Sequence, residues 1–107
     1  MCRAEYIEVC GLFAKAKGMR VVDGCGQFGG VPGIVAMDGE GTLRFIEARE
    51  KGEAAADVGH AASAAASWLA EWGVDGFVET DVEIDLMRFC EIGGQVVFNY
   101  KKAACAA

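Results

Sequence analysis

Apolar side chains recur along this chain with two different periods. Between residues 4 and 17 they return every three or four positions, the spacing of one helix face, and Gly18 then ends the pattern. Short apolar or alternating runs predict strands at residues 20–22, 34–37 and 42–48. The last two runs flank Asp38-Gly39-Glu40-Gly41, in which Gly and Asp tolerate the positive φ of a hairpin turn.

The second half of the chain repeats the same two periods. Residues 53–72 form a long Ala-rich stretch that predicts a helix ended by Gly73. Strands are predicted at residues 80–89 and 95–100, joined through Gly93-Gly94. The predicted order is αβββαββ, so we expect one α/β (α+β) domain over residues 1–107.

A glycine-rich segment separates the first two strands. Five glycines lie between residues 24 and 33, but they complete no phosphate-loop pattern. Pro32 removes a hydrogen-bond donor from any strand that contains it. We therefore expect a flexible segment here, and a second strand that is shortened around Pro32.

The most informative chemistry lies where the run 42–48 ends. Side chains alternate between the two faces of a strand, so Glu47 and Arg49 point the same way and can address one site. In a magnesium-dependent phosphodiesterase, such an acid gives an oxygen to the ion, and the neighbouring base neutralises phosphate charge. Arginine keeps its proton near neutral pH, so Arg49 would bind phosphate and not act as a base. The alternative is a strand end carrying solvated charges.

Four segments together resemble the YraN-like family, uncharacterised bacterial proteins that are similar to Holliday junction resolvases. Residues 18–22 (Gly-Met-Arg-Val-Val) resemble the family's Gly-Tyr-x-Ile-Leu strand. Residues 38–51, from Asp-Gly to Glu-Ala-Arg-Glu-Lys, resemble its Asp-Gly-x-Thr-Leu-x-Phe-Val-Glu-Val-Lys-x-Arg motif. Residues 65–73 resemble its Ala-x-x-Trp-Leu helix end, and residues 80–82 its Phe-Asp-Val strand. The resemblance implies a restriction-endonuclease-like core, with a mixed sheet and flanking helices.

The chain also departs from that family. The family's Gly-Glu-Ile-Asp-Leu corresponds here to Gly30-Val31-Pro32-Gly33-Ile34, so Val31 and Gly33 stand where the resemblance places two metal-binding acids. Glu47 matches the third acidic position, and Arg49 replaces a Lys. The family's acid from the first helix would fall near Glu5 or Glu8. The resemblance thus implies a catalytic remnant of Glu47 and Arg49, with Glu47 as a weak metal ligand.

The charge distribution disfavours nucleic acid as a partner. The formal net charge is −6, and no Lys or Arg lies between Lys51 and Arg88. DNA and RNA backbones are bound chiefly through Lys and Arg. The candidate nucleic-acid-binding residues are Arg44, Arg49 and Lys51, joined by Lys15, Lys17 and Arg20 if the first helix lies beside the hairpin. The alternative is scattered solvated charges.

Other candidate residues have simpler interpretations. His60 is the only histidine, and we expect it at the surface or partly buried. Trp68, Leu69 and Trp72 recur at helical spacing and are expected to pin the helix to the sheet. A row of alternating acids could bind a divalent ion but is typical of the wet face of an edge strand. That row comprises Asp81, Glu83 and Asp85.

Composition and cysteine spacing bound the remaining possibilities. No apolar run is long enough to cross a bilayer and no secretory signal is evident, so we expect a cytoplasmic protein without a membrane partner. Five cysteines without a Cys-x-x-Cys pair argue against a disulfide framework or a zinc site. We expect Cys10 and Cys90 to be buried.

Two functional hypotheses follow. The first is a catalytically degenerate, nuclease-like binding or assembly module. It would have no cofactor, and its partner would be an unidentified protein, a weakly bound nucleic acid or further copies of itself. The second is an active Mg²⁺-dependent endonuclease on branched or single-stranded DNA that uses Glu47 and Arg49, with help from Asp38 or a first-helix acid. A third possibility is a divergent domain without any ligand, retained for subunit assembly.

Overall fold

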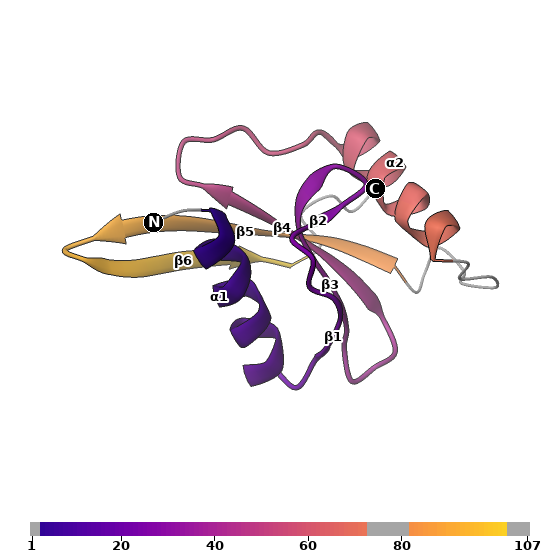
Figure 1. The fold of residues 1–107 in the computed structure, drawn as a ribbon, viewed down its shortest axis with the longest axis horizontal. Coiled ribbons are helices and arrows are strands. Elements are labelled where there is room, and N and C mark those ends of the chain that lie inside the picture. The colour runs from indigo at the N-terminus through magenta and orange to yellow at the C-terminus, as the bar shows by residue number, and fades with distance from the viewer. Residues whose placement is uncertain (1–2, 73–81, 103–107) are drawn as a thin grey trace.

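The structure, a computed structural model, is an α+β fold with two helices and a mixed six-stranded sheet (Figure 1). It describes residues 3–72 and 82–102, with the backbone alone for Arg3 and Val58. Neither described helix, each 14 residues long, is long and apolar enough to cross a membrane.

The elements follow the predicted order with one addition. They are α1 (Arg3–Ala16), β1 (Arg20–Asp23), β2 (Gln27–Phe28), β3 (Val31–Met37), β4 (Leu43–Glu50), α2 (Val58–Glu71), β5 (Val82–Ile92) and β6 (Gln95–Lys101). The addition is β2, two residues long, which lies inside the glycine-rich segment. Residues 80 and 81, the predicted start of the fifth strand, and the predicted helix stop Gly73 lie outside the described residues.

The second helix is shorter than its Ala-rich composition predicts. It begins at Val58 and not at residue 53, because the side chain of Asp57 caps it. The Asp57 carboxylate accepts a hydrogen bond from the backbone N–H of His60 at 2.7 Å, which satisfies one of the unpaired donors of the first turn. The four predicted helix residues before the cap, 53–56, instead belong to the segment that connects β4 to α2.

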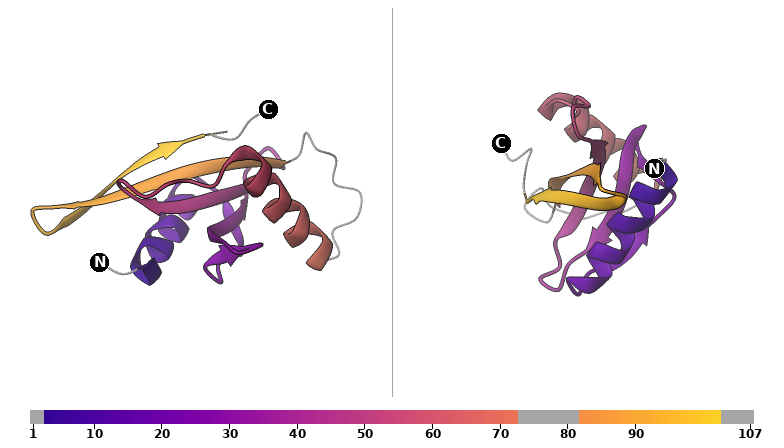
Figure 2. Two further views of the ribbon diagram at one scale, coloured as in Figure 1. Left: turned by 90° about the horizontal axis from the view of Figure 1, so that it is seen from above. Right: turned by 90° about the vertical axis from the view of Figure 1, so that its left-hand side faces the viewer.

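The sheet runs in the order β1-β3-β4-β5-β6, and β2 pairs with the start of β3. All of these pairs are antiparallel except β4 with β5, which is parallel because α2 provides the crossover between them. The β5–β6 hairpin projects past the helices at one end of the molecule (Figure 2, left).

Pro32 does not shorten the second predicted strand. The strand β3 starts at Val31, and Pro32 lies opposite Gln27 of the two-residue β2. The next residue, Gly33, donates its N–H to the carbonyl of Gly26 at 3.0 Å. A proline is accommodated here because it stands near the start of the strand, where the neighbouring strand is very short.

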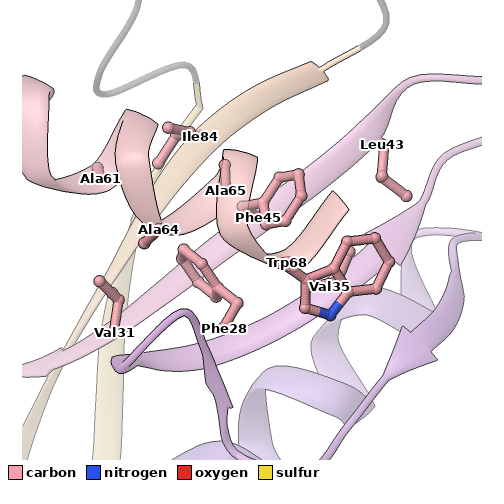
Figure 3. Packing of buried hydrophobic residues seen from close by; sticks show 10 residues of the cluster. All are labelled: Phe28, Val31, Val35, Leu43, Phe45, Ala61, Ala64, Ala65, Trp68 and Ile84. Carbon is pink, nitrogen blue, oxygen red and sulfur yellow. The ribbon is translucent and has the colours of Figure 1, made fainter. Parts of the chain in front are cut away.

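Two apolar clusters sandwich the sheet, one under each helix. Alternate residues of β4 serve both: Leu43 and Phe45 pack towards α2, whereas Ile46 and Ala48 pack towards α1. On the α2 side, Phe45 meets Phe28 and Trp68 edge to face, with ring centroids 5.2 and 5.4 Å apart (Figure 3). Glu47 belongs to the α2 face, and Arg44 to the α1 face.

Candidate functional site

Glu47 is a buried acid with an occupied carboxylate. Its side chain is 1% exposed and lies on the α2 face of β4, next to the crossover segment 51–57. One oxygen, Oε2, accepts hydrogen bonds from Nε of Arg49 at 2.5 Å and from the backbone N–H of Ala56 at 2.9 Å. The carboxylate thus ties the crossover segment to the sheet.

Two further charged groups surround this pair. Arg49, 17% exposed, also lies 3.6 Å from the carboxylate of Glu53 through Nη1. Arg88, the register neighbour of Arg49 on β5, donates to the backbone carbonyl of Glu53 at 2.7 Å. Glu47 and Arg49 therefore share a face, as strand alternation predicts, and both are engaged in holding the chain that leads into α2.

The positions that the family resemblance assigns to metal-binding acids lie beside Glu47. Gly33 is the register partner of Glu47 on β3, and Val31 is fully buried in the α2-side cluster. Neither residue has a side-chain oxygen. A Cβ on Gly33 would stand 2.0 Å from the carbonyl oxygen of Ile46, so the backbone leaves no room for any side chain at that position.

The other proposed helper acids lie elsewhere. Asp38 accepts hydrogen bonds from the backbone N–H groups of Glu40 and Thr42, each at 2.9 Å, at the hairpin end of β4. Glu5 and Glu8 are exposed on α1, which covers the face of the sheet opposite Glu47. Within residues 3–72 and 82–102, no group of three or more His, Cys, Asp or Glu side chains could hold a metal ion.

Arg44 is a buried ion-pair residue, which corrects its assignment to a nucleic-acid-binding surface. Its side chain is 3% exposed and contacts Asp38 at 2.9 Å, Glu83 at 2.8 Å and Asp85 at 3.1 Å. Burial alone would lower the pKa of Arg44, but Asp85 and the other carboxylates raise it above its ordinary value. The hydroxyl of Tyr100 donates a hydrogen bond to Asp85.

The row of acids on β5 also differs from its prediction. Asp85 is completely buried and Glu83 partly so, because β5 lies between β4 and β6 and is not an edge strand. Both carboxylates neutralise Arg44. Asp81, the third member of the predicted row, lies outside the described residues.

The structure does not assemble the predicted basic patch. Arg20 of β1 lies opposite Met37 of β3, and Met37 pairs with Leu43. Arg20 is therefore level with the first residue of β4. Arg49 and Lys51 lie at its far end, on the other side of the buried Arg44. Of the three candidate residues Arg44, Arg49 and Lys51, only Lys51 is fully exposed.

The tryptophans of α2 differ in their roles. Trp68 is buried and pins the helix to the sheet as predicted, and its indole N–H donates to Asp23 at 2.7 Å. Trp72 stacks on Trp68 with ring centroids 4.9 Å apart, yet remains 49% exposed. Leu69 is partly buried against the same cluster, and His60 is exposed, as expected.

Two of the three described cysteines, Cys10 and Cys25, have thiols that are poorly suited to act as nucleophiles. Cys10 is buried as predicted, and burial raises the pKa of its thiol to about 12. Cys90 is only half-buried. Cys25 lines an open pocket of about 570 Å³ between α1 and the glycine-rich segment, where its hydrogen bond with Asp23 raises the pKa of the thiol. Thiols with raised pKa values stay protonated and unreactive near neutral pH.

The sequence did not predict two partners of Glu47 and Arg49, the N–H of Ala56 and the Glu53 carboxylate, or the neighbouring Arg88, which binds the Glu53 carbonyl. The sequence pattern predicts Glu53 inside the second helix, and that position does not indicate its ion pair with Arg49. Asp57 carried a clearer sequence signal, because Asp is a favoured N-cap residue and α2 begins directly after it. Nothing in the sequence fixes the register that sets Arg88 beside Arg49.

Comparisons with family models, curated proteins and solved structures found no match for this chain.

Proposed function

We propose that this chain is a nuclease-like domain that has lost phosphodiester chemistry and serves as a binding or assembly module. The observation that carries the proposal is the environment of Glu47. Its carboxylate accepts hydrogen bonds from Arg49 and the Ala56 N–H, and its register partner on the adjacent strand is Gly33. The resemblance of residues 38–51 to the YraN-like family, with its restriction-endonuclease-like fold, supports the nuclease origin.

Magnesium chemistry needs more oxygen atoms than this site offers. The ion is held in an octahedron by one or two carboxylates together with water and substrate phosphate. Here one oxygen of Glu47 already accepts two N–H groups, one of them from a cationic guanidinium. Coordination through that oxygen would have to break a charge-assisted hydrogen bond inside a nearly dry site. The close approach of Gly33 to Ile46 also bars a second acid from β3.

A protein partner suits the surface better than a nucleic acid. The chain has a net charge of −6. Arg44, the buried arginine of the predicted basic patch, already forms ion pairs with three carboxylates. A phosphate backbone would meet Lys51 and part of Arg49 at this end of β4. Two such contacts give little of the counterion release that drives non-specific binding.

A cleavage assay tests the proposal. Purified protein should not cut branched, single-stranded or duplex DNA in Mg²⁺ or Mn²⁺ above the level of a matched Glu47→Ala preparation. The comparison with that variant controls for contaminating nucleases, because only cleavage that depends on Glu47 can be assigned to this site. Metal-dependent cleavage that disappears in Glu47→Ala would establish the endonuclease alternative.

A further inference from the structure

The strand β6 closes one side of the sheet with an unpaired edge. Among residues 3–72 and 82–102 it pairs with β5 alone. From Gln95 to Tyr100 it contains no proline and no charged residue, which are the usual protections of an edge strand. Val97 and Phe98 are 44% and 45% exposed, so the edge is apolar as well as open.

The hydrogen-bonding direction of this edge can be deduced from its neighbours. The carbonyl of Phe89 accepts from the N–H of Lys51 at 2.7 Å, so the backbone groups of Phe89 point towards the β4 side. Phe98 is the register partner of Phe89 and must form a non-hydrogen-bonded pair with it. The N–H and C=O of Phe98 therefore point away from β5. By alternation, those of Val96 and Tyr100 do the same.

The same three residues present their side chains on the α1 face. Val96 and Tyr100 pack at the border of the α1-side cluster. Phe98 meets Phe13 of α1 edge to face, with ring centroids 5.4 Å apart. Leu12, the residue before Phe13, is 60% exposed. An apolar surface thus lies along the row of outward-directed backbone groups.

We propose that a second copy of this chain pairs with β6, antiparallel and centred on Phe98. This inference rests on the assembly role proposed above. In that register Phe98 lies opposite Phe98 of the partner subunit, and Val96 lies opposite Tyr100 of the partner subunit. Each outward N–H and C=O then finds an acceptor or donor, and the apolar side chains of both copies meet on one face.

Charge supports a copy of the chain as the occupant. The hairpin carries Glu91 near its tip, beside Val96, and Lys101 and Lys102 at the other end of β6. In that register Lys101 lies opposite Gln95 of the partner subunit, so the lysines of each copy lie at the tip end of the other copy's hairpin, whose β5 strand carries Glu91. The register needs no like charges in contact, although each chain has a net charge of −6.

Sedimentation of the full chain tests the pairing. As the concentration rises to about 500 µM, the mass should approach twice the 11.3 kDa of one chain, by mass action. Phe98→Lys sets two like charges opposite each other and should raise the dissociation constant roughly tenfold or more. Val97→Gln is the control, because residue 97 is equally exposed but lies on the other face and the change adds no charge to the edge, so its dimer should persist.

A cysteine cross-link keeps the test decisive if Phe98→Lys does not fold. Directly opposed residues of a hydrogen-bonded antiparallel pair have Cα atoms about 5.5 Å apart, within disulfide range. Oxidised Phe98→Cys should give a covalent dimer joined at residue 98, as identified by mass spectrometry, whereas Val97→Cys should not join two chains through residue 97.

A wild-type chain that stays monomeric throughout, or a dimer indifferent to Phe98→Lys with no cross-link at 98, would overturn the pairing. Neither outcome touches the loss of catalysis at Glu47, which the cleavage assay decides separately.

Discussion

Single residues show how this chain uses buried charge. Glu47 and Arg44 lie three residues apart on β4, so they face opposite sides of the sheet, and both are nearly inaccessible. Each is paired inside the protein: Glu47 accepts hydrogen bonds from Arg49, two residues along β4, and from the Ala56 N–H, whereas Arg44 contacts acids from the hairpin and from β5. Removing one partner from such a pair leaves an uncompensated buried charge, which costs several kcal/mol, about 3–5.

Asp23 provides a residue-scale prediction of pH dependence. Burial raises the pKa of its carboxyl, but hydrogen bonds from the Cys25 N–H and the Trp68 indole outweigh that effect, so its pKa in the folded protein lies below the ordinary value. Its stabilising contribution is complete above the unfolded pKa of about 3.9 and is lost as the pH falls through the folded pKa.

We therefore expect the free energy of unfolding in urea to fall between about pH 7 and about pH 3, and to fall less in Asp23→Asn. Some dependence should remain in the variant, because the Thr42 N–H and Arg44 also lower the pKa of Asp38 against its burial. Equal losses in wild type and Asp23→Asn would show that the bond to Trp68 does not stabilise the charged form.

Among the elements, β3 is the most constrained. Residues 31–32 pair with β2, residues 35–37 pair with β1, and residues 33–37 pair with β4. Gly33 sits where the first partner gives way to the second, and its backbone approaches Ile46 too closely for any side chain. The sheet therefore requires a glycine at this position.

Gly33→Ala should lower the free energy of unfolding by about 3 kcal/mol, because its Cβ would overlap the Ile46 carbonyl and force the strands apart. Gly39→Ala is the control: a Cβ there would meet no atom within 4 Å, so the change should be within about 0.5 kcal/mol. The two values come from urea unfolding under identical conditions. A Gly33→Ala protein as stable as the Gly39→Ala protein would refute the close approach.

Periodicity and turn residues predicted most of the elements because the helices and strands present regularly spaced apolar residues to the two clusters. Two elements, α2 and β2, differ from the predicted ones. The exceptions are instructive. Alanine-rich composition extended the second helix through residues 53–57, where one capping carboxylate, Asp57, decides the start. The strand β2 is too short to show any period and exists because β3 offers it a partner.

The site was harder to predict than the elements. Alternation placed Glu47 and Arg49 on one face, since that depends on local geometry alone. The burial of Arg44 and Asp85 depends on β5 lying inside the sheet, parallel to β4, and this is a tertiary choice that a row of alternating acids does not reveal. An isolated strand with those acids has the pattern of an exposed edge.

At the scale of the whole molecule, the arrangement separates two regions with different roles. On the α2 face, the buried Glu47 is hydrogen-bonded to Arg49 and to the crossover segment. The β5–β6 hairpin projects away from both helices and leaves an apolar edge at β6 (Figures 1 and 2). The proposed loss of catalysis concerns the first region, and the proposed pairing of two copies concerns the second.

The most direct measurement of the central claim is the free energy of unfolding of wild type and Glu47→Ala, each with and without Mn²⁺. If the Glu47 carboxylate is a structural anchor, Mn²⁺ should leave wild-type stability unchanged, and Glu47→Ala should lower it by about 3 kcal/mol in either condition. If it is a metal ligand, saturating Mn²⁺ should stabilise wild type by more than about 2 kcal/mol and Glu47→Ala should abolish that gain. The second result would contradict the account.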